Sequence, residues 1–292
     1  MRRWSNLLSL KLYESDVKPD WCPGCGDFGV LAALKNALAT LQIPPERVQI
    51  SSGIGCSSNL PGYIRTFGHH GLHGRPVPVA TGIKMANPDM VVIVTAGDGD
   101  EYGIGFNHLV HAARRNHDIK VIVMNNEIYG LTTGQLSPTS EKGQRTKTSP
   151  DGSIIYPLNP LTTLLGAGAT FVARGFSGDP KQLSSLIQEA IKHRGFALID
   201  TLSPCVTWHD IYDKVRAKMY KLEGTAHDSS DLISAYRLAL ESDRIPLGLF
   251  YRTEDRPSFE ELMSEDVTST YPVDNARNLT AEQIASVMAR FS

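Results

Sequence analysis

The chain has 292 residues, and we expect one α/β domain over residues 1–215 followed by a helical C-terminal extension over residues 216–292. The net charge is −2, and no long basic run is present that would follow a phosphate backbone, which argues against a nucleic-acid partner. The apolar stretches are far shorter than the roughly 20 residues that cross a bilayer, and no signal-peptide pattern follows Arg2-Arg3. We therefore expect a cytoplasmic protein that does not bind a membrane.

Helical and strand patterns alternate along the first part of the chain. In order, they predict a helix that Gly26-Asp27 can cap, a strand at 48–50, a helix that opens near Pro76 and ends before Asn87, a strand at 90–96 and a helix at about 103–116. Then come a strand at 119–125, a helix near 160–167, a strand at 170–174, a helix at 180–194 and a strand at 197–202. This alternation predicts a parallel sheet with helices on both faces.

Two segments depart from the alternation. Residues 136–153 are polar and rich in Ser, Thr, Lys and Gly, which predicts a long mobile loop that is either functional or disordered. Residues 206–292 lose the rhythm, although a helix is expected at 230–242 and Thr280 to Gln283 resembles a capping box that opens a final helix. This tail either docks a second protein chain or covers the core.

Asp98 and Asn126 stand directly after two apolar runs, a pairing that resembles thiamine diphosphate enzymes. The step between them has the length of one strand–helix–strand crossover, so both side chains would emerge at the same edge of a parallel sheet. Their oxygens suit Mg²⁺, which also takes phosphate and water, and the Ile128 carbonyl is a candidate third ligand. An Asp-Gly turn or a strand-end Asn is common by itself, but the pair at this spacing predicts a magnesium–diphosphate site.

Histidines offer further candidate ligands. His70, His73 and Arg75 lie in one glycine-containing segment, where His73 is the favoured contact for a diphosphate and a surface loop with incidental histidines is the alternative. We expect His108, His111 and His117 to be exposed or to lie at the edge of the core, and not to be ligands.

The four cysteines are Cys22, Cys25, Cys56 and Cys205. Disulfides are disfavoured in a protein without an export signal, so metal or cluster ligation gains weight. The first two precede a predicted helix and the others follow predicted strands, which places all four at the edge expected for Asp98. Four thiolates suit zinc or an iron–sulfur cluster, while a single cysteine could be a small buried apolar residue. The shared edge favours a redox cluster.

Several motifs together resemble the β subunit of the 2-oxoacid:ferredoxin oxidoreductases, namely Trp21 to Gly26, Ser52 to Ser57, His70 to Arg75, Gly97 to Asp100 and Asn125 to Thr132. The resemblance covers residues 18 to about 215 and implies a thiamine diphosphate-binding fold. It implies CoA-dependent oxidative decarboxylation of a 2-oxo acid to acyl-CoA and CO2, with reduction of ferredoxin, or the reverse reaction in CO2 fixation. In the two-subunit members, the glutamate that activates the cofactor belongs to the α subunit, so we expect a heterodimer or a dimer of heterodimers and an inactive isolated chain.

The resemblance also implies ligands at individual positions, with no catalytic residue assigned. One [4Fe–4S] cluster would be held by Cys22, Cys25, Cys56 and Cys205, and Mg²⁺ by Asp98, Asn126 and the Ile128 carbonyl. Thiamine diphosphate would contact Ile54, Gly55, Cys56, Ser57, His73, Gly99, Asp100, Gly130 and Leu131.

The opening motif and the segment Gly71 to Arg75 are more similar to 2-oxoglutarate enzymes than to pyruvate enzymes. Asn59 and Thr133 depart from the lysines of some broad-specificity members, which leaves the partner of a distal substrate carboxylate open. The candidates, each also explicable as an ordinary surface charge, are Arg65, Arg75 and Lys84. The alternatives are a pyruvate-specific member, a non-redox thiamine diphosphate lyase or synthase with structural zinc, and a metal-stabilised interaction protein without the thiamine cofactor.

Overall fold

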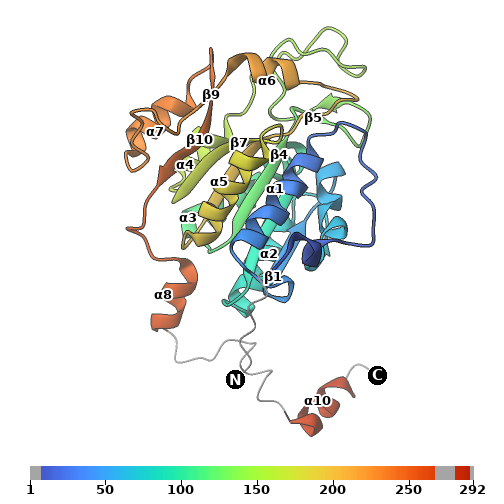
Figure 1. Cartoon of the computed structure of the whole chain (residues 1–292), viewed down its shortest axis with the longest axis vertical. Helices are drawn as coiled ribbons and strands as arrows, with labels where there is room; N and C mark the ends of the chain where they lie inside the picture. Colours follow the sequence, from blue (N-terminus) through green and yellow to red (C-terminus); the bar gives the residue numbers. More distant parts are fainter. Residues whose placement is uncertain (1–7, 267–279, 290–292) are drawn as a thin grey trace.

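Parallel strands form the centre of the molecule (Figure 1). The computed structural model describes residues 8–266 and 280–289. Its main sheet has the strand order β2 (Phe67–His70), β1 (Val48–Ser52), β3 (Val91–Gly97), β4 (Lys120–Asn125), β8 (Ala197–Leu202), β7 (Phe171–Phe176), β10 (Ile245–Arg252) and β9 (Met219–Lys221). The first six run parallel, whereas β10 is antiparallel to β7 and parallel to β9.

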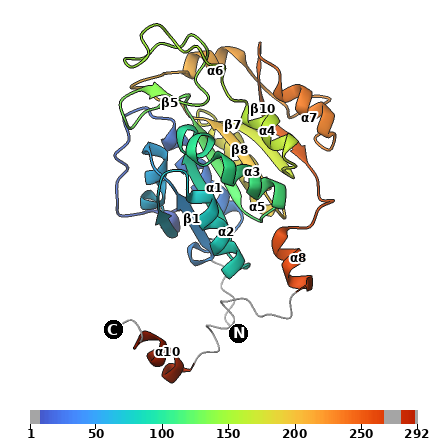
Figure 2. The same ribbon diagram turned by 180° about the vertical axis from the view of Figure 1, so that it is seen from behind.

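Helices cover both faces of the sheet, as the two opposite views show (Figures 1 and 2). On one face lie α1 (Asp27–Thr40) and α5 (Pro180–Lys192); on the other lie α2 (Pro76–Ala86), α3 (Phe106–Arg115), α4 (Pro160–Gly166) and α7 (Leu232–Ala239). In α1 the fully buried residues Val30, Leu34 and Leu38 recur at helical spacing. The strands β4 and β8 are buried along their whole length, as expected for parallel strands between two helical layers. The predicted fold class is confirmed.

The remaining elements are short helices, turns and a hairpin outside the main sheet. They are η1 (Leu10–Tyr13), η2 (Pro45–Arg47), η3 (Cys56–Tyr63), η4 (Gly99–Ile104), the hairpin β5 (Ile128–Tyr129) and β6 (Gln135–Leu136), α6 (Tyr212–Lys218), α8 (Phe259–Asp266) and α10 (Ala281–Met288). Among the residues that the structure describes, no helix has both the length and the apolarity that a membrane crossing requires.

Several predicted elements need correction. The helix expected at about 103–116 is confirmed as α3, but it begins later, at Phe106, because η4 precedes it and Gly103 has non-helical dihedral angles. The helix expected at 230–242 is shorter, since α7 ends at Ala239. The exclusively helical extension is also wrong, because β9 and β10 join the main sheet. The expected domain boundary at residue 215 stays a prediction.

The final capping box is confirmed. The Thr280 backbone N–H donates to Gln283 Oε1 at 2.8 Å, and the Gln283 N–H donates back to Thr280 Oγ1 at 3.2 Å. These reciprocal bonds satisfy two backbone donors that the start of α10 leaves without helical partners.

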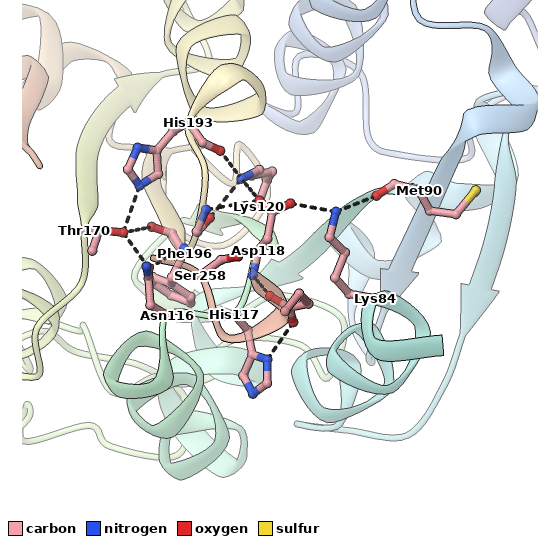
Figure 3. Close-up of polar contacts among 12 residues, drawn as sticks. Lys84, Met90, Asn116, His117, Asp118, Lys120, Thr170, His193, Phe196 and Ser258 are labelled. Carbon is pink, nitrogen blue, oxygen red and sulfur yellow. Dashed lines mark hydrogen bonds and ion pairs between the residues drawn. The ribbon is translucent and has the colours of Figure 1, made fainter. Parts of the chain in front are cut away.

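A buried polar network lies at the edge of the sheet where the parallel strands begin, here called the amino-end edge (Figure 3). Asn116 ends α3 in the left-handed conformation, with φ of 58° and 1% exposure. Its side-chain oxygen accepts from Thr170 Oγ1 at 2.7 Å and from the Phe196 N–H at 2.9 Å. Its amide donates to the carbonyls of Arg256 and Pro257 at 3.1 and 3.0 Å. One side chain thus joins the starts of two strands to the segment before α8.

Charged side chains extend the same network. Lys120 Nζ donates to Asp118 at 2.5 Å and to the His193 and Gly195 carbonyls at 2.6 and 2.9 Å. Asp118 also pairs with Lys84 at 2.6 Å. Burial acts to raise the pKa of Asp118, but the two lysines outweigh it and hold the pKa at about 2. The charges at this edge therefore satisfy one another.

We predict that Asn116→Ala lowers the free energy of unfolding by about 2–4 kcal/mol, because buried partners lose their bonds and Ala adopts the left-handed conformation less readily than Asn. Urea unfolding measures the change. Asn36→Ala is the control: Asn36 is exposed on α1 and donates to the Ala32 carbonyl, so the expected change is within about 0.5 kcal/mol. Equal effects of the two substitutions would contradict this role of Asn116.

Candidate functional site

A cavity of about 330 Å³ lies where β1, β3, β4 and β8 end. The structure brings to its lining every residue that the family resemblance implies as a cluster, magnesium or thiamine diphosphate ligand. These are Cys22, Cys25, Ile54, Gly55, Cys56, Ser57, His73, Asp98, Gly99, Asp100, Asn126, Ile128, Gly130, Leu131 and Cys205. Their individual roles as ligands stay predictions.

Asp98 follows β3 and is 2% exposed. Its Oδ2 accepts hydrogen bonds from Ser137 Oγ at 2.5 Å and from Thr139 Oγ1 at 2.6 Å. Burial raises the pKa of Asp98 to about 6, although these two bonds offset part of the effect. A cation beside Asp98 would stabilise the ionised carboxylate, because its positive charge would replace the solvation that burial removes.

Asn126 follows β4, and a sharp turn separates it from β5. Glu127 has a positive φ of 61°, and the Ile128 N–H donates to Asn126 Oδ1 at 3.1 Å. The Glu127 carboxylate is held by Lys214 at 2.9 Å and His209 at 3.3 Å. The turn brings two oxygen-bearing residues, Asn126 and Ile128, to the cavity that Asp98 lines.

His73 reaches the cavity from the loop before α2. Its Nδ1 contacts Asp100 Oδ1 at 2.5 Å, and the same oxygen accepts from the Gly74 N–H at 2.7 Å. Burial raises the pKa of Asp100, while Gly74 and His73 oppose the increase. This contact fixes the His73 ring and leaves its Nε2 for a ligand.

Glycines allow the backbone around the cavity to pack closely against neighbouring side chains. A Cβ on Gly99 would lie 2.2 Å from the Tyr129 ring, and a Cβ on Gly53 would lie 2.0 Å from Asp100 Oδ2. Gly55 has φ of 121°, which side-chain-bearing residues rarely adopt. Close packing at these positions requires residues without a side chain.

All four cysteines are free, with Cys22 exposed and the other three partly buried. Burial raises the pKa of Cys25, and Asp27, Cys205 and Cys56 raise it further. Burial likewise raises the pKa of Cys56 to about 11, with contributions from Asp27, Cys205 and Cys22. Ionisation of one of these cysteines therefore opposes ionisation of the others. Within residues 8–266 and 280–289, no group of three or more His, Cys, Asp and Glu side chains could hold a single metal ion.

Asp27 lies where the first predicted helix begins. It is the first residue of α1, and its side chain makes no cap bond but accepts from Ser203 Oγ at 2.7 Å. It also lines the cavity, as does Trp208. The predicted helix start is confirmed, with Gly26 at the N-cap, but no side chain makes a capping bond there.

The candidates for a distal substrate carboxylate do not line the cavity. Lys84 belongs to the opposite edge of the sheet, where it pairs with Asp118. Arg65 and Arg75 are exposed outside the lining. His117 is buried against Glu260 at 2.9 Å, while His108 and His111 are half-buried on α3. The expectation of exposed or core-edge positions fits His108 and His111 better than His117, which is 3% exposed, and none of the three lines the cavity.

The segment expected to be a mobile loop contributes directly to the site. Ser137 and Thr139 are buried against Asp98, and the sequence reasoning missed both. A short Ser-Pro-Thr-Ser run inside a polar stretch is typical of a surface loop. Nothing in the local pattern distinguishes buried hydroxyls from solvated ones.

Two family models match the chain. The first describes the C-terminal, thiamine pyrophosphate-binding domain of thiamine pyrophosphate enzymes and matches residues 53–201. The second describes the C-terminal part of the beta subunit of pyruvate ferredoxin oxidoreductase and matches residues 205–266. The two matches together span most of the chain.

Individual relatives are similar over nearly the same length. The chain is 42% identical over 276 residues to 2-oxoacid:ferredoxin oxidoreductase 1, subunit beta, from Aeropyrum pernix, covering 90% of this chain and 86% of that protein. It is 40% identical over 257 residues to 2-oxoglutarate synthase subunit KorB from Methanocaldococcus jannaschii, covering 87% and 95%.

A solved structure is similar over nearly the whole chain. It is the 2-oxoglutarate:ferredoxin oxidoreductase from Magnetococcus marinus with 2-oxoglutarate, coenzyme A and succinyl-CoA bound. The TM-score is 0.86 at 38% identity, and the match covers 94% of this chain and 97% of that chain.

We predict that Gly53→Ala lowers the free energy of unfolding by about 1–3 kcal/mol, because the added methyl group displaces the buried Asp100 carboxylate. Urea unfolding of the two variants in parallel measures the effect. The control is Gly82→Ala on α2, where a Cβ meets nothing within 4 Å and a gain of up to about 1 kcal/mol is expected. A neutral Gly53→Ala would show that the glycine is not required for packing.

Proposed function

This chain belongs to the β subunits of the 2-oxoacid:ferredoxin oxidoreductases, and on that premise we propose that, with an α subunit, it converts 2-oxoglutarate and CoA to succinyl-CoA and CO2. Ferredoxin takes the electrons, and a low-potential donor can drive the reverse reaction. The observation that carries the proposal is one shared cavity, which Asp98, Asn126 and all four cysteines line.

The cation side of the cavity fits Mg²⁺ and a diphosphate. Asp98, Asn126 and the Ile128 carbonyl supply the oxygen ligands that Mg²⁺ takes from proteins. His73, oriented by Asp100, would donate to the diphosphate. Thiamine diphosphate, when bound, would supply a nucleophilic carbon that adds to the 2-oxo group and a cationic ring that takes up the electron pair left when CO2 departs. The chain's own part is to hold and orient the diphosphate end.

The cysteine side fits a [4Fe–4S] cluster. Each iron of such a cluster takes one cysteine thiolate, so the sulfurs need to surround a space and not to meet at one point. The four cysteines are free and line the cavity beside the cation residues. Burial raises the pKa of Cys25 and Cys56, so iron must displace their protons. A cluster in this position would take electrons from the thiamine cofactor and pass them to ferredoxin.

The relatives support 2-oxoglutarate as the substrate. The Methanocaldococcus relative is named a 2-oxoglutarate synthase subunit, and the Magnetococcus structure holds 2-oxoglutarate and coenzyme A. Lys84 does not bind the distal carboxylate of the substrate, because it forms an ion pair with Asp118 at the other edge of the sheet.

We predict that the co-purified α and β subunits reduce ferredoxin with 2-oxoglutarate and CoA, with a kcat/KM at least about tenfold higher than with pyruvate. Such a ratio corresponds to about 1.4 kcal/mol of transition-state discrimination. Anaerobic assays that follow ferredoxin absorbance measure it. A preference for pyruvate would contradict the substrate assignment. Decarboxylation without ferredoxin reduction would favour a lyase with structural zinc.

We predict that two single substitutions in the complex remove different cofactors. Cys205→Ser should lower the iron content from about four atoms per chain while thiamine diphosphate is retained. Asp98→Ala should retain the iron but lose magnesium and thiamine diphosphate. Iron analysis and fluorometric thiamine determination on the same samples measure both. Zinc in place of iron in the wild-type complex would contradict the redox role of the cysteines.

A further inference from the structure

Residues Ser137 to Ser140, here called the hydroxyl clamp, form a buried turn beside the cation residues. Ser137, Thr139 and Ser140 are 9%, 6% and 3% exposed. The turn is internally bonded, since the Ser137 N–H donates to Ser140 Oγ at 2.8 Å and the Ser140 N–H donates to the Ser137 carbonyl at 3.1 Å. The Leu158 N–H donates to the Pro138 carbonyl at 2.8 Å, so the turn is also bonded to the chain that follows the polar segment.

The first half of the clamp sets the orientation of Asp98. Ser137 Oγ and Thr139 Oγ1 both bond to Asp98 Oδ2, at 2.5 and 2.6 Å. Two donors on one oxygen hold the plane of the carboxylate, and the Asn126 backbone N–H bonds to the same carboxylate. Thr139 Oγ1 also lies 2.9 Å from Asn125 Oδ1, but its single proton bonds more strongly to an ionised carboxylate than to an amide.

The second half of the clamp holds the turn that carries Asn126 and Ile128. Ser140 Oγ donates to the Glu127 carbonyl at 2.6 Å, and Gln144 Nε2 donates to the same carbonyl at 3.2 Å. Glu127 has a positive φ of 61°, a conformation that costs about 1–2 kcal/mol in a residue with a Cβ. The hydrogen bonds to its carbonyl offset that cost and keep the turn in the form that brings both neighbours to the cavity.

We propose that Ser137, Thr139 and Ser140 are positioning residues for the cation, because one turn fixes both of the arms that would hold Mg²⁺. This inference rests on the proposed magnesium–diphosphate site. Partners that orient metal ligands typically contribute about 10–100-fold to metal affinity. The clamp therefore sets the affinity for Mg²⁺ and leaves the cysteine side of the cavity unaffected.

The test is a Mg²⁺ titration of the α–β complex after chelation, at saturating thiamine diphosphate, by isothermal titration calorimetry. Thr139→Val should raise the Kd for Mg²⁺ by about 10–100-fold, whereas Thr139→Ser should stay within about threefold of wild type because it keeps the hydroxyl. Ser137→Ala tests the second donor and should raise the Kd about tenfold. The iron content should be unchanged in every variant.

The matched control is Thr201→Val on β8. Thr201 is fully buried, and its hydroxyl has no hydrogen-bond partner in the described part of the chain, so the Kd for Mg²⁺ should not change. An unchanged Kd for Mg²⁺ in both Thr139→Val and Ser137→Ala would contradict the positioning role of the hydroxyl clamp. A Thr139→Ser variant that binds Mg²⁺ as weakly as Thr139→Val would also contradict it. Absence of Mg²⁺ binding in the wild-type complex would overturn the proposed site itself, and the clamp with it.

Discussion

Parallel pairing of β1, β3, β4 and β8 is the constraint on which the rest of the structure depends. The pairing places Ser52 beside Thr95, Gly97 beside Met124 and Asn125 beside Leu202, so the four strands end along one edge. The segments that follow them must turn over this edge to reach their crossover helices. Chemistry-bearing residues in those turns are therefore neighbours in space, whatever their separation in the chain.

The two edges of the sheet use polar groups in opposite ways. At the amino-end edge, Asn116 has four partners and Asp118 has two lysines, so the buried polar groups satisfy one another. At the carboxyl-end edge, buried carboxylates meet hydroxyl and backbone donors, and burial raises the pKa of Asp98 and Asp100. A buried carboxylate whose pKa is raised by burial is typical of a site whose balancing charge arrives with a ligand.

The sequence predicted the elements whose apolar runs are strong and whose turns are marked by glycine. Asp98, Asn126 and the cysteines could be placed together because strand direction alone decides which edge they occupy. β2 could not be predicted, because all four of its residues are exposed and two are histidines. The roles of Thr139 and Lys84 could not be predicted either, because their partners lie far away in sequence and local patterns do not indicate burial. Polar residues occur both on surfaces and in satisfied buried networks, and the local sequence is the same in both cases.

The central claim is that the thiolate centre and the cation residues share one cavity. Anomalous diffraction at the iron absorption edge, from crystals of the anaerobically purified complex with magnesium and thiamine diphosphate, tests it most directly. The account predicts an iron peak between the sulfurs of Cys22, Cys25, Cys56 and Cys205, on the wall of the cavity that holds the cation beside Asp98. An iron peak elsewhere, or a peak that appears only at the zinc edge, would contradict it.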